Sequence, residues 1–113
     1  MPLPDDRDTF EAAFRAAVAA VLPSATVEVV ARTIVAIKLR VDVDENRFID
    51  AFFNERNRRT DLSLIEGGRR VFGYDNLGDW HCHPLAAPDR HEACEAPTLE
   101  SCVRAAVTGS RTT

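Results

Sequence analysis

Most side chains that can exchange a proton near neutral pH lie in one short window of this chain. His81 and His83 stand between residues 69 and 84, together with the only Trp and the only Tyr of the 113 residues, and His91 follows shortly after. If the segment is extended, a His-x-His pair projects both imidazoles to one side. Imidazoles titrate close to neutral pH, so two of them, or one with Asp75, can move the proton in a phosphoryl or acyl transfer.

Among these reactions, RNA cleavage needs the fewest catalytic groups from the protein, because the 2′-hydroxyl of the substrate is itself the nucleophile. The protein then supplies a base, an acid and a cation for the phosphate. Arg56, Arg59, Arg69 and Arg70 precede the histidines, and guanidinium groups match phosphate oxygens. Between residues 47 and 70 six Arg stand against four acidic residues, although the whole chain has a formal charge of -4. This distribution is compatible with a local basic patch on an acidic protein.

The same window allows two other interpretations. The first is a tetrahedral Zn²⁺ site with nitrogen and sulfur ligands, for which Cys82 is an alternative ligand. Its four ligands would be His81, His83, His91 and Cys94. The second is structural, because His and Trp side chains can fill the space between a loop and a sheet.

Asp75 and Asn76 stand at the end of the preceding predicted strand and also have two interpretations. Asp75 could orient a histidine or hold a metal, and Asn76 could donate a hydrogen bond to a phosphate. Both residue types are equally favoured at a junction between strand and turn, where they bond to nearby backbone groups. Tyr74 and Trp80 could likewise stack on RNA bases or pack in the core.

The elements that must position these residues follow from apolar periodicity. Apolar residues recur at helical spacing from Phe10 to Leu22, before Pro23, and Asp8 with Glu11 forms a start resembling a capping box. This pattern predicts an amphipathic helix of about four turns.

After this helix the apolar pattern changes to a period of two, which is typical of strands with one buried face. Residues 26–44 are too many for one strand, so we divide them near Arg32-Thr33 at a bulge or tight bend. Further strands are expected at 48–55, 61–65 and 69–75. We assign to the core the apolar residues Phe48, Phe52, Phe53, Ile65 and Phe72.

Gly67-Gly68 predicts a two-residue hairpin loop, because glycine accepts the positive φ angles of a primed turn. Counting back from this loop gives the register of the two strands. It places Glu66 opposite Arg69, Leu64 opposite Val71, Leu62 opposite Gly73 and Thr60 opposite Asp75. Asp75 and Asn76 should therefore meet the histidine loop at one edge of the sheet.

These elements predict one α+β domain over residues 1–113. It has an N-terminal helix, an antiparallel meander of about five strands with its helices on one face, a histidine-containing loop and a short C-terminal helix. That last helix is opened by Thr98 and Glu100 and carries the apolar residues Leu99, Cys102, Val103 and Ala106. No run approaches the roughly 18 to 20 apolar residues that cross a bilayer, and the first residues lack an apolar secretory core. Three cysteines, an odd number, favour reduced thiols, so we expect a cytoplasmic protein.

The segment Ser63-Leu64-Ile65-Glu66-Gly67-Gly68-Arg69-Arg70-Val71-Phe72-Gly73-Tyr74-Asp75-Asn76, followed by Trp80-His81-Cys82-His83-Pro84 and His91, resembles the TumE family of toxins from bacterial and archaeal toxin-antitoxin systems. The likeness consists of a strand after a Gly turn, an aromatic-Asp-Asn end and a loop with histidines and proline. The resemblance implies a small α+β toxin with ribonuclease activity, held inactive by an antitoxin with a helix-turn-helix DNA-binding domain. The positions that correspond are Asp75, Asn76, His81, His83 and His91, to which Arg70 is added. The family has a Pro-His pair directly after Asp-Asn, where this chain has Leu77-Gly78.

We therefore expect a metal-independent endoribonuclease toxin without a cofactor. His81 or His83 would be the general base, the other histidine or His91 the general acid, and Arg70 would stabilise the phosphorane while Asp75 fixes an imidazole tautomer. The expected partners are an RNA substrate and a helix-turn-helix antitoxin, with no membrane, and a homodimer is compatible with the chain. The alternatives are the zinc protein and a non-catalytic module whose sheet edge or aromatic loop binds a protein.

Overall fold

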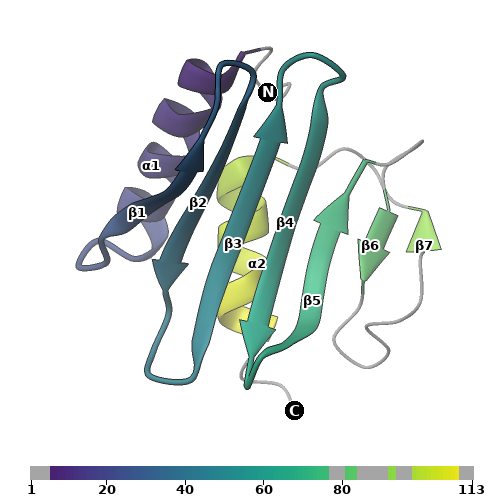
Figure 1. Cartoon of the computed structure of the whole chain (residues 1–113). Coiled ribbons are helices and arrows are strands. Elements are labelled where there is room, and N and C mark those ends of the chain that lie inside the picture. Colours follow the sequence, from purple (N-terminus) through teal and green to yellow (C-terminus); the bar gives the residue numbers. More distant parts are fainter. Residues whose placement is uncertain (1–5, 77–80, 84–91, 94–97, 110–113) are drawn as a thin grey trace.

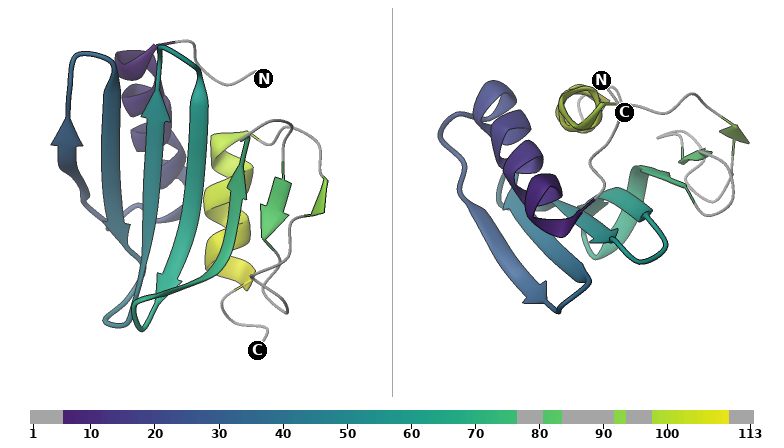
Figure 2. Two further views of the ribbon diagram at one scale, coloured as in Figure 1. Left: turned by 45° about the vertical axis from the view of Figure 1, so that its right-hand side comes forward. Right: turned by 90° about the horizontal axis from the view of Figure 1, so that it is seen from above.

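A single antiparallel sheet with two helices on one of its faces makes up the computed structural model, which describes residues 6–76, 81–83, 92–93 and 98–109 (Figure 1). Each strand pairs with the strand next to it in the chain, in the order β1-β2-β3-β4-β5-β6-β7. The five long strands are β1 (Val27–Arg32), β2 (Ala36–Asp42), β3 (Arg47–Asn54), β4 (Arg59–Glu66) and β5 (Arg69–Asp75). The predicted α+β meander is confirmed, and the view from above shows both helices on the same side of the sheet (Figure 2).

The first helix, α1 (Arg7–Val21), begins two residues before the capping box that the sequence suggested. Asp6 is the N-cap, and its carboxylate accepts hydrogen bonds from the Thr9 backbone N–H at 2.8 Å and the Thr9 hydroxyl at 2.9 Å. Asp8 therefore lies inside the first turn, where its charge suits the positive end of the helix. The buried residues of this helix follow the predicted stripe: Phe10, Phe14, Ala17 and Val18.

The alternating strand residues divide the sheet into a face that packs against the helices and a face that does not. The side chains on the helix face of β2 and β3 are buried: Ile37, Leu39, Val41, Ile49, Ala51 and Phe53. We call the opposite side the open face. The assignment of Phe48, Phe52 and Ile65 to the core is wrong, because each alternates onto the open face and is only half-buried. Their apolar character gave no information about which face they occupy.

The hairpin between β4 and β5 has the predicted turn but a different register beyond it. Gly67 and Gly68 have φ angles of 59° and 81°, and Glu66 pairs with Arg69 as expected. The register then shifts by one residue at Val71, which is an extra residue in β5. The observed pairs are Ile65 with Arg70, Leu64 with Phe72, Ser63 with Gly73, Leu62 with Tyr74 and Asp61 with Asp75.

This β-bulge has a physical reason. In the regular register, Asp75 would share the helix face with Leu62 and Leu64, and an ionised carboxylate is costly to bury among apolar side chains. With the extra residue, Phe72 and Tyr74 take the helix face, where their rings pack edge to face with centroids 5.4 Å apart. Asp75 moves to the open face, because a shift of one residue exchanges the two faces of a strand.

The segment predicted as a histidine loop contains two short strands, β6 (His81–His83) and β7 (Glu92–Ala93), which extend the sheet beyond β5. The helix α2 (Leu99–Gly109) follows the sheet in the chain and begins after Thr98 as expected. The Ser101 N–H donates to the Thr98 hydroxyl at 3.1 Å, and the predicted apolar stripe of this helix is buried in the core. No helix in the described part of the chain is long and apolar enough to cross a membrane.

Candidate functional site

The backbone pairing of β5 with β6 brings Asp75 and the two neighbouring histidines to the same end of the sheet. His81 pairs with Asp75, and His83 pairs with Gly73. The segment is therefore extended, which is the condition under which a His-x-His pair lies on one face. Residues directly opposite in an antiparallel pair also share a face, so these positions belong to the open face.

The register continues across the sheet and aligns two rows of residues on the open face. One row runs from β2 to β6 through Lys38, Phe52, Asp61, Asp75 and His81. The next runs through Arg40, Asp50, Ser63, Gly73 and His83. Polar residues therefore lie beside one another on five adjacent strands, although the positions that supply them are far apart in sequence.

Asp75 is nearly covered although it lies on the open face, with a relative exposure of 6%. Its cross-strand neighbours are Asp61 on one side and His81 on the other. Two carboxylates directly opposite each other in a sheet repel, whereas a carboxylate opposite a histidine is a complementary pair. The register thus places a carboxylate position on one side of Asp75 and a histidine position on the other.

Gly73 lies between Ser63 and His83 in the second row. A Cβ atom at this position would come within 2.7 Å of the Leu62 carbonyl oxygen, so the backbone leaves no room for a side chain. As a result, no β5 side chain separates Ser63 from position 83 on the open face. Gly73 itself is buried, so this part of the row is covered rather than open to solvent.

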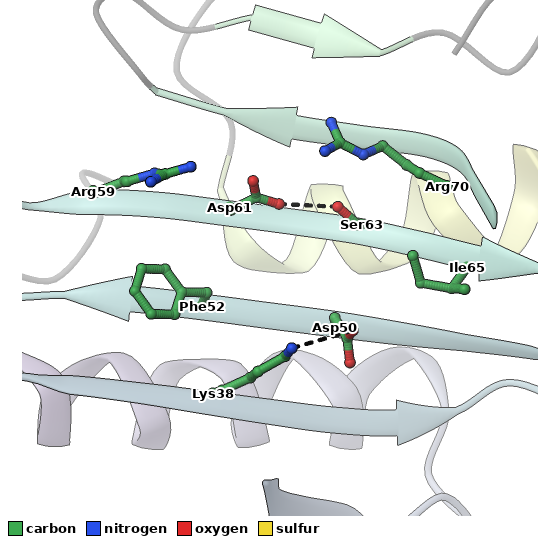
Figure 3. Close-up of a pocket in the computed structure, with 8 residues that line it drawn as sticks. All are labelled: Lys38, Asp50, Phe52, Arg59, Asp61, Ser63, Ile65 and Arg70. Carbon is green, nitrogen blue, oxygen red and sulfur yellow. Dashed lines mark hydrogen bonds and ion pairs between the residues drawn. The ribbon is translucent and has the colours of Figure 1, made fainter. Parts of the chain in front are cut away.

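A groove of about 450 Å³ occupies the open face beside these rows (Figure 3). Its lining residues come from β2, β3, β4 and β5: Lys38, Asp50, Phe52, Arg59, Asp61, Ser63, Ile65 and Arg70. The floor of this groove is therefore the strand face itself, with charged residues around two apolar side chains.

Both groove carboxylates have partners within the groove or beside it. Asp50 forms ion pairs with Lys38 at 3.9 Å and with Arg40 at 3.1 Å. Asp61 accepts a hydrogen bond of 2.9 Å from the Ser63 hydroxyl. Arg40 also lies over the Phe48 ring, 4.2 Å from its centroid, as a cation–π contact.

Arg59 and Arg70 differ from these paired charges, because neither has an ion pair or a side-chain hydrogen bond within the described part of the chain. Their side chains extend toward each other from the two ends of the groove (Figure 3). Of the four arginines that the sequence proposed as phosphate ligands, these two line the groove, whereas Arg56 and Arg69 do not. Free guanidinium groups on an open surface are suited to bind an anion.

The side chain of Asn76 forms hydrogen bonds with β4 and with the turn before it. Its side-chain oxygen accepts from the Thr60 N–H at 2.6 Å, and its amide nitrogen donates to the Arg58 carbonyl at 2.8 Å. Arg58 has a positive φ of 59° in the turn before β4, a conformation that few non-glycine residues adopt. The amide thus fixes this turn, in agreement with the structural interpretation of Asn76.

Part of the predicted site lies outside the described residues. His91, Cys94 and Trp80 are among these residues, and two of the four proposed zinc ligands therefore lie outside the described part of the chain. Within the described residues, no group of three or more His, Cys, Asp or Glu side chains is arranged to hold a metal ion. Tyr74 packs against the core, which supports its structural interpretation over base stacking.

The polar side of the groove was not predicted from the sequence. It consists of Lys38, Asp50, Asp61 and Ser63. A signal was present, because these residues alternate with apolar residues in strands whose other face is buried. The sequence does not reveal that residues from three strands line up, since that depends on the register.

Comparison with known proteins identifies no family for this chain. No family model, no curated protein and no solved structure matches it. The resemblance to TumE toxins therefore stays a prediction.

Proposed function

We propose that this chain is a metal-independent endoribonuclease, of the kind expected for a toxin, that cleaves RNA by histidine acid–base catalysis at the β5–β6 end of the open face. The observation that carries the proposal is the pairing of His81 with Asp75, on the face that also holds Arg59 and Arg70, two arginines without an ion pair among the described residues. A carboxylate opposite a histidine is the arrangement that orients an imidazole and selects its tautomer.

The spacing of the two histidines suits a base and an acid on either side of one phosphate. Successive residues on the same face of a strand are about 6.8 Å apart, since each residue advances the chain by about 3.4 Å. His81 and His83 pair with Asp75 and Gly73, so both histidine positions lie along the same short stretch of β5. A phosphate bound at this end of the sheet would lie within reach of both positions.

In the proposed reaction, one histidine takes the proton of the 2′-hydroxyl as its oxygen attacks the adjacent phosphorus. The bond from phosphorus to the 5′-oxygen breaks, and the other histidine donates a proton to that oxygen. The products are a 2′,3′-cyclic phosphate and a 5′-hydroxyl, so atoms and charge balance without a further reactant. Arg70 stabilises the negative charge of the phosphorane, and Asp75 orients His81.

The proposal includes the partner implied by the resemblance, a helix-turn-helix antitoxin that binds the chain and blocks its activity. Expression of the chain alone would then arrest growth, and expression together with the adjacent antitoxin gene would restore it. If no neighbouring gene relieves the effect, the toxin part of the proposal is wrong. A homodimer would leave the catalytic scheme unchanged.

The catalytic proposal predicts that His81→Ala and His83→Ala each lower the rate of RNA cleavage by about 100-fold or more, as expected for removal of a general acid or base. Wild-type cleavage should follow a bell-shaped pH profile with both limbs between about pH 5 and 8. The measurement is cleavage of a labelled RNA by purified protein, with the unfolding curve of each variant showing that the fold is intact. His91→Ala should have the smallest effect of the three.

Arg104→Ala is the matched control, because Arg104 lies on α2 and pairs with Glu100 at 3.2 Å, on the helix layer. It should cleave RNA at the wild-type rate. Full activity in both His81→Ala and His83→Ala would contradict the proposal. Elemental analysis separates the zinc alternative, since stoichiometric zinc whose removal abolishes activity or folding would support a metal site instead.

A further inference from the structure

We propose that the open face of β2 to β5 binds single-stranded RNA, with Arg59 and Arg70 contacting different phosphates of one strand and Phe52 stacking against a base. This inference rests on the proposed function and deepens it by assigning the substrate to residues other than the histidines. The groove adjoins Asp75 through Asp61, so RNA bound there would extend directly to the β5–β6 end.

The charge of the groove favours a polyanion. Lys38, Arg59 and Arg70 line it together with two carboxylates, Asp50 and Asp61, so the lining carries an excess of one positive charge. This excess stands on a chain whose formal charge is -4. Asp50 already engages Lys38 and Arg40, so Arg59 and Arg70, which form no ion pair within the described part of the chain, are the groups available for phosphate.

The distance between these two arginines favours a chain of phosphates over a single anion. Arg59 begins β4, and Arg70 pairs with Ile65, which lies six residues further along the same strand. Six residues of an antiparallel strand cover about 20 Å. Because the two side chains extend toward each other from these positions, their guanidinium groups are suited to neighbouring phosphates of one strand (Figure 3).

The apolar part of the groove favours unpaired bases. Phe52 lies on the groove floor between Lys38 and Asp61 in the cross-strand register, and its ring is half-buried and faces the groove (Figure 3). Stacking on an aromatic ring requires a base that is not stacked within a duplex. Phosphate contacts alone would not distinguish single from double strands, so Phe52 predicts that distinction.

The test is fluorescence anisotropy with a labelled single-stranded RNA of about twelve nucleotides, a length within known site sizes. Every 2′-hydroxyl of the probe is methylated, so binding is measured without cleavage. Arg59→Ala and Arg70→Ala should each weaken binding by about 5- to 10-fold and lower the slope of log affinity against log salt by about 0.7. Phe52→Ala should weaken binding by about 5-fold or more, and Phe52→Tyr should retain it within about 2-fold, since tyrosine also stacks.

Arg104→Ala again serves as the matched control and should bind like the wild type. The duplex form of the probe should bind at least about 10-fold more weakly than the single strand, because its bases cannot stack on Phe52. Equal binding of duplex and single strand would overturn the assignment to Phe52, and wild-type affinity in both arginine variants would overturn the assigned surface. No binding to the wild type would overturn the whole inference and leave the face to a protein partner.

Different outcomes would contradict the RNA-binding surface and the ribonuclease activity. Binding with the expected variant effects but without cleavage of unmodified RNA would uphold the surface and contradict the ribonuclease. Cleavage of unmodified RNA by a chain whose groove variants bind normally would uphold the ribonuclease and contradict the surface.

Discussion

The side chain of Asn76 shows how a residue beside a candidate site can act on the scaffold. Both polar atoms of its amide are bonded to β4 and the turn before it, at Thr60 and Arg58. The Asn76 backbone N–H also donates to the Thr60 carbonyl at 3.2 Å. The end of β5 is thereby tied to the start of β4, next to Asp75.

This role predicts that Asn76→Ala lowers the free energy of unfolding by about 2 kcal/mol, because the Thr60 N–H loses its acceptor and two side-chain hydrogen bonds disappear. Urea unfolding measures the change. Asn57→Ala is the matched control, since Asn57 accepts one hydrogen bond from the Arg59 N–H in an exposed turn and its loss should cost less than about 1 kcal/mol. Unchanged stability combined with lost RNA cleavage would instead indicate that Asn76 acts on the substrate.

At the scale of the element, the bulge in β5 decides which residues share a face. Arg70 and Asp75 are an odd number of residues apart, so a regular strand would place them on opposite faces. The extra residue, Val71, puts both on the open face and lets Val71 and Phe72 pack against the core. The bulge is therefore the local feature that combines a groove cation with the carboxylate beside His81.

A pair of deletions tests this interpretation. Deletion of Val71 leaves both flanking registers intact, so the variant should fold and lose only about 1 kcal/mol for a half-buried valine. Deletion of Gly73 should cost at least about 3 kcal/mol, because it would turn Tyr74 out of the core and Asp75 into it. Unfolding curves of the two variants provide the comparison, and equal losses would show that the bulge does not set the register.

The positions of the helices and strands could be predicted from the sequence, but the side of the sheet on which each strand residue lies could be predicted less well. The positions of α1, the β1–β2 division, the Gly67-Gly68 turn and α2 were predictable, because capping, periodicity and turn chemistry are local. The register beyond Val71 was not, since a bulge carries no strong local signal and its position depends on what the core accepts. The groove could not be predicted for the same reason. Phe52 has the character of a core residue, and only the strand register shows that it lies on the open face.

At the scale of the molecule, polar contacts fix the helix layer to the first edge of the sheet. Glu11 on α1 accepts from Arg32 of β1 at 2.6 Å and from Arg15 at 2.9 Å. Arg7 donates to the Thr33 carbonyl in the β1–β2 turn. Burial raises the pKa of Glu11, but the hydrogen bonds from Arg32 and Arg15 outweigh this effect and hold the pKa below its usual 4.5.

The lowered pKa gives a pH-dependent contribution to stability. Because the pKa of Glu11 is lower in the folded chain, its stabilisation is present above pH 4.5 and is lost as the pH falls through the folded pKa. Glu11→Gln should therefore lower the free energy of unfolding by about 0.5 kcal/mol at pH 7, a modest value because the arginines are largely exposed. This difference from the wild type should disappear in acid, as followed by urea unfolding across pH, and a constant difference at every pH would contradict the assignment. Glu100→Gln, in an exposed pair confined to α2, should change stability by less than about 0.3 kcal/mol at pH 7.

The strictly sequential strand order also determines at which stage of synthesis the sheet and the core can form. Each strand pairs with its neighbour in the chain, so the sheet can grow by local hairpins while the chain is being made. The core cannot form locally in this way, because α1 and α2 pack against each other on the helix face although the entire sheet separates them in sequence. Leu99, Cys102 and Val103 must leave the ribosome before that face is closed, so a nascent chain carries exposed apolar surface until α2 is made. Any chemistry that requires a rigid open face therefore begins after translation has passed α2, and a partner made at the same time can meet the chain before that activity starts.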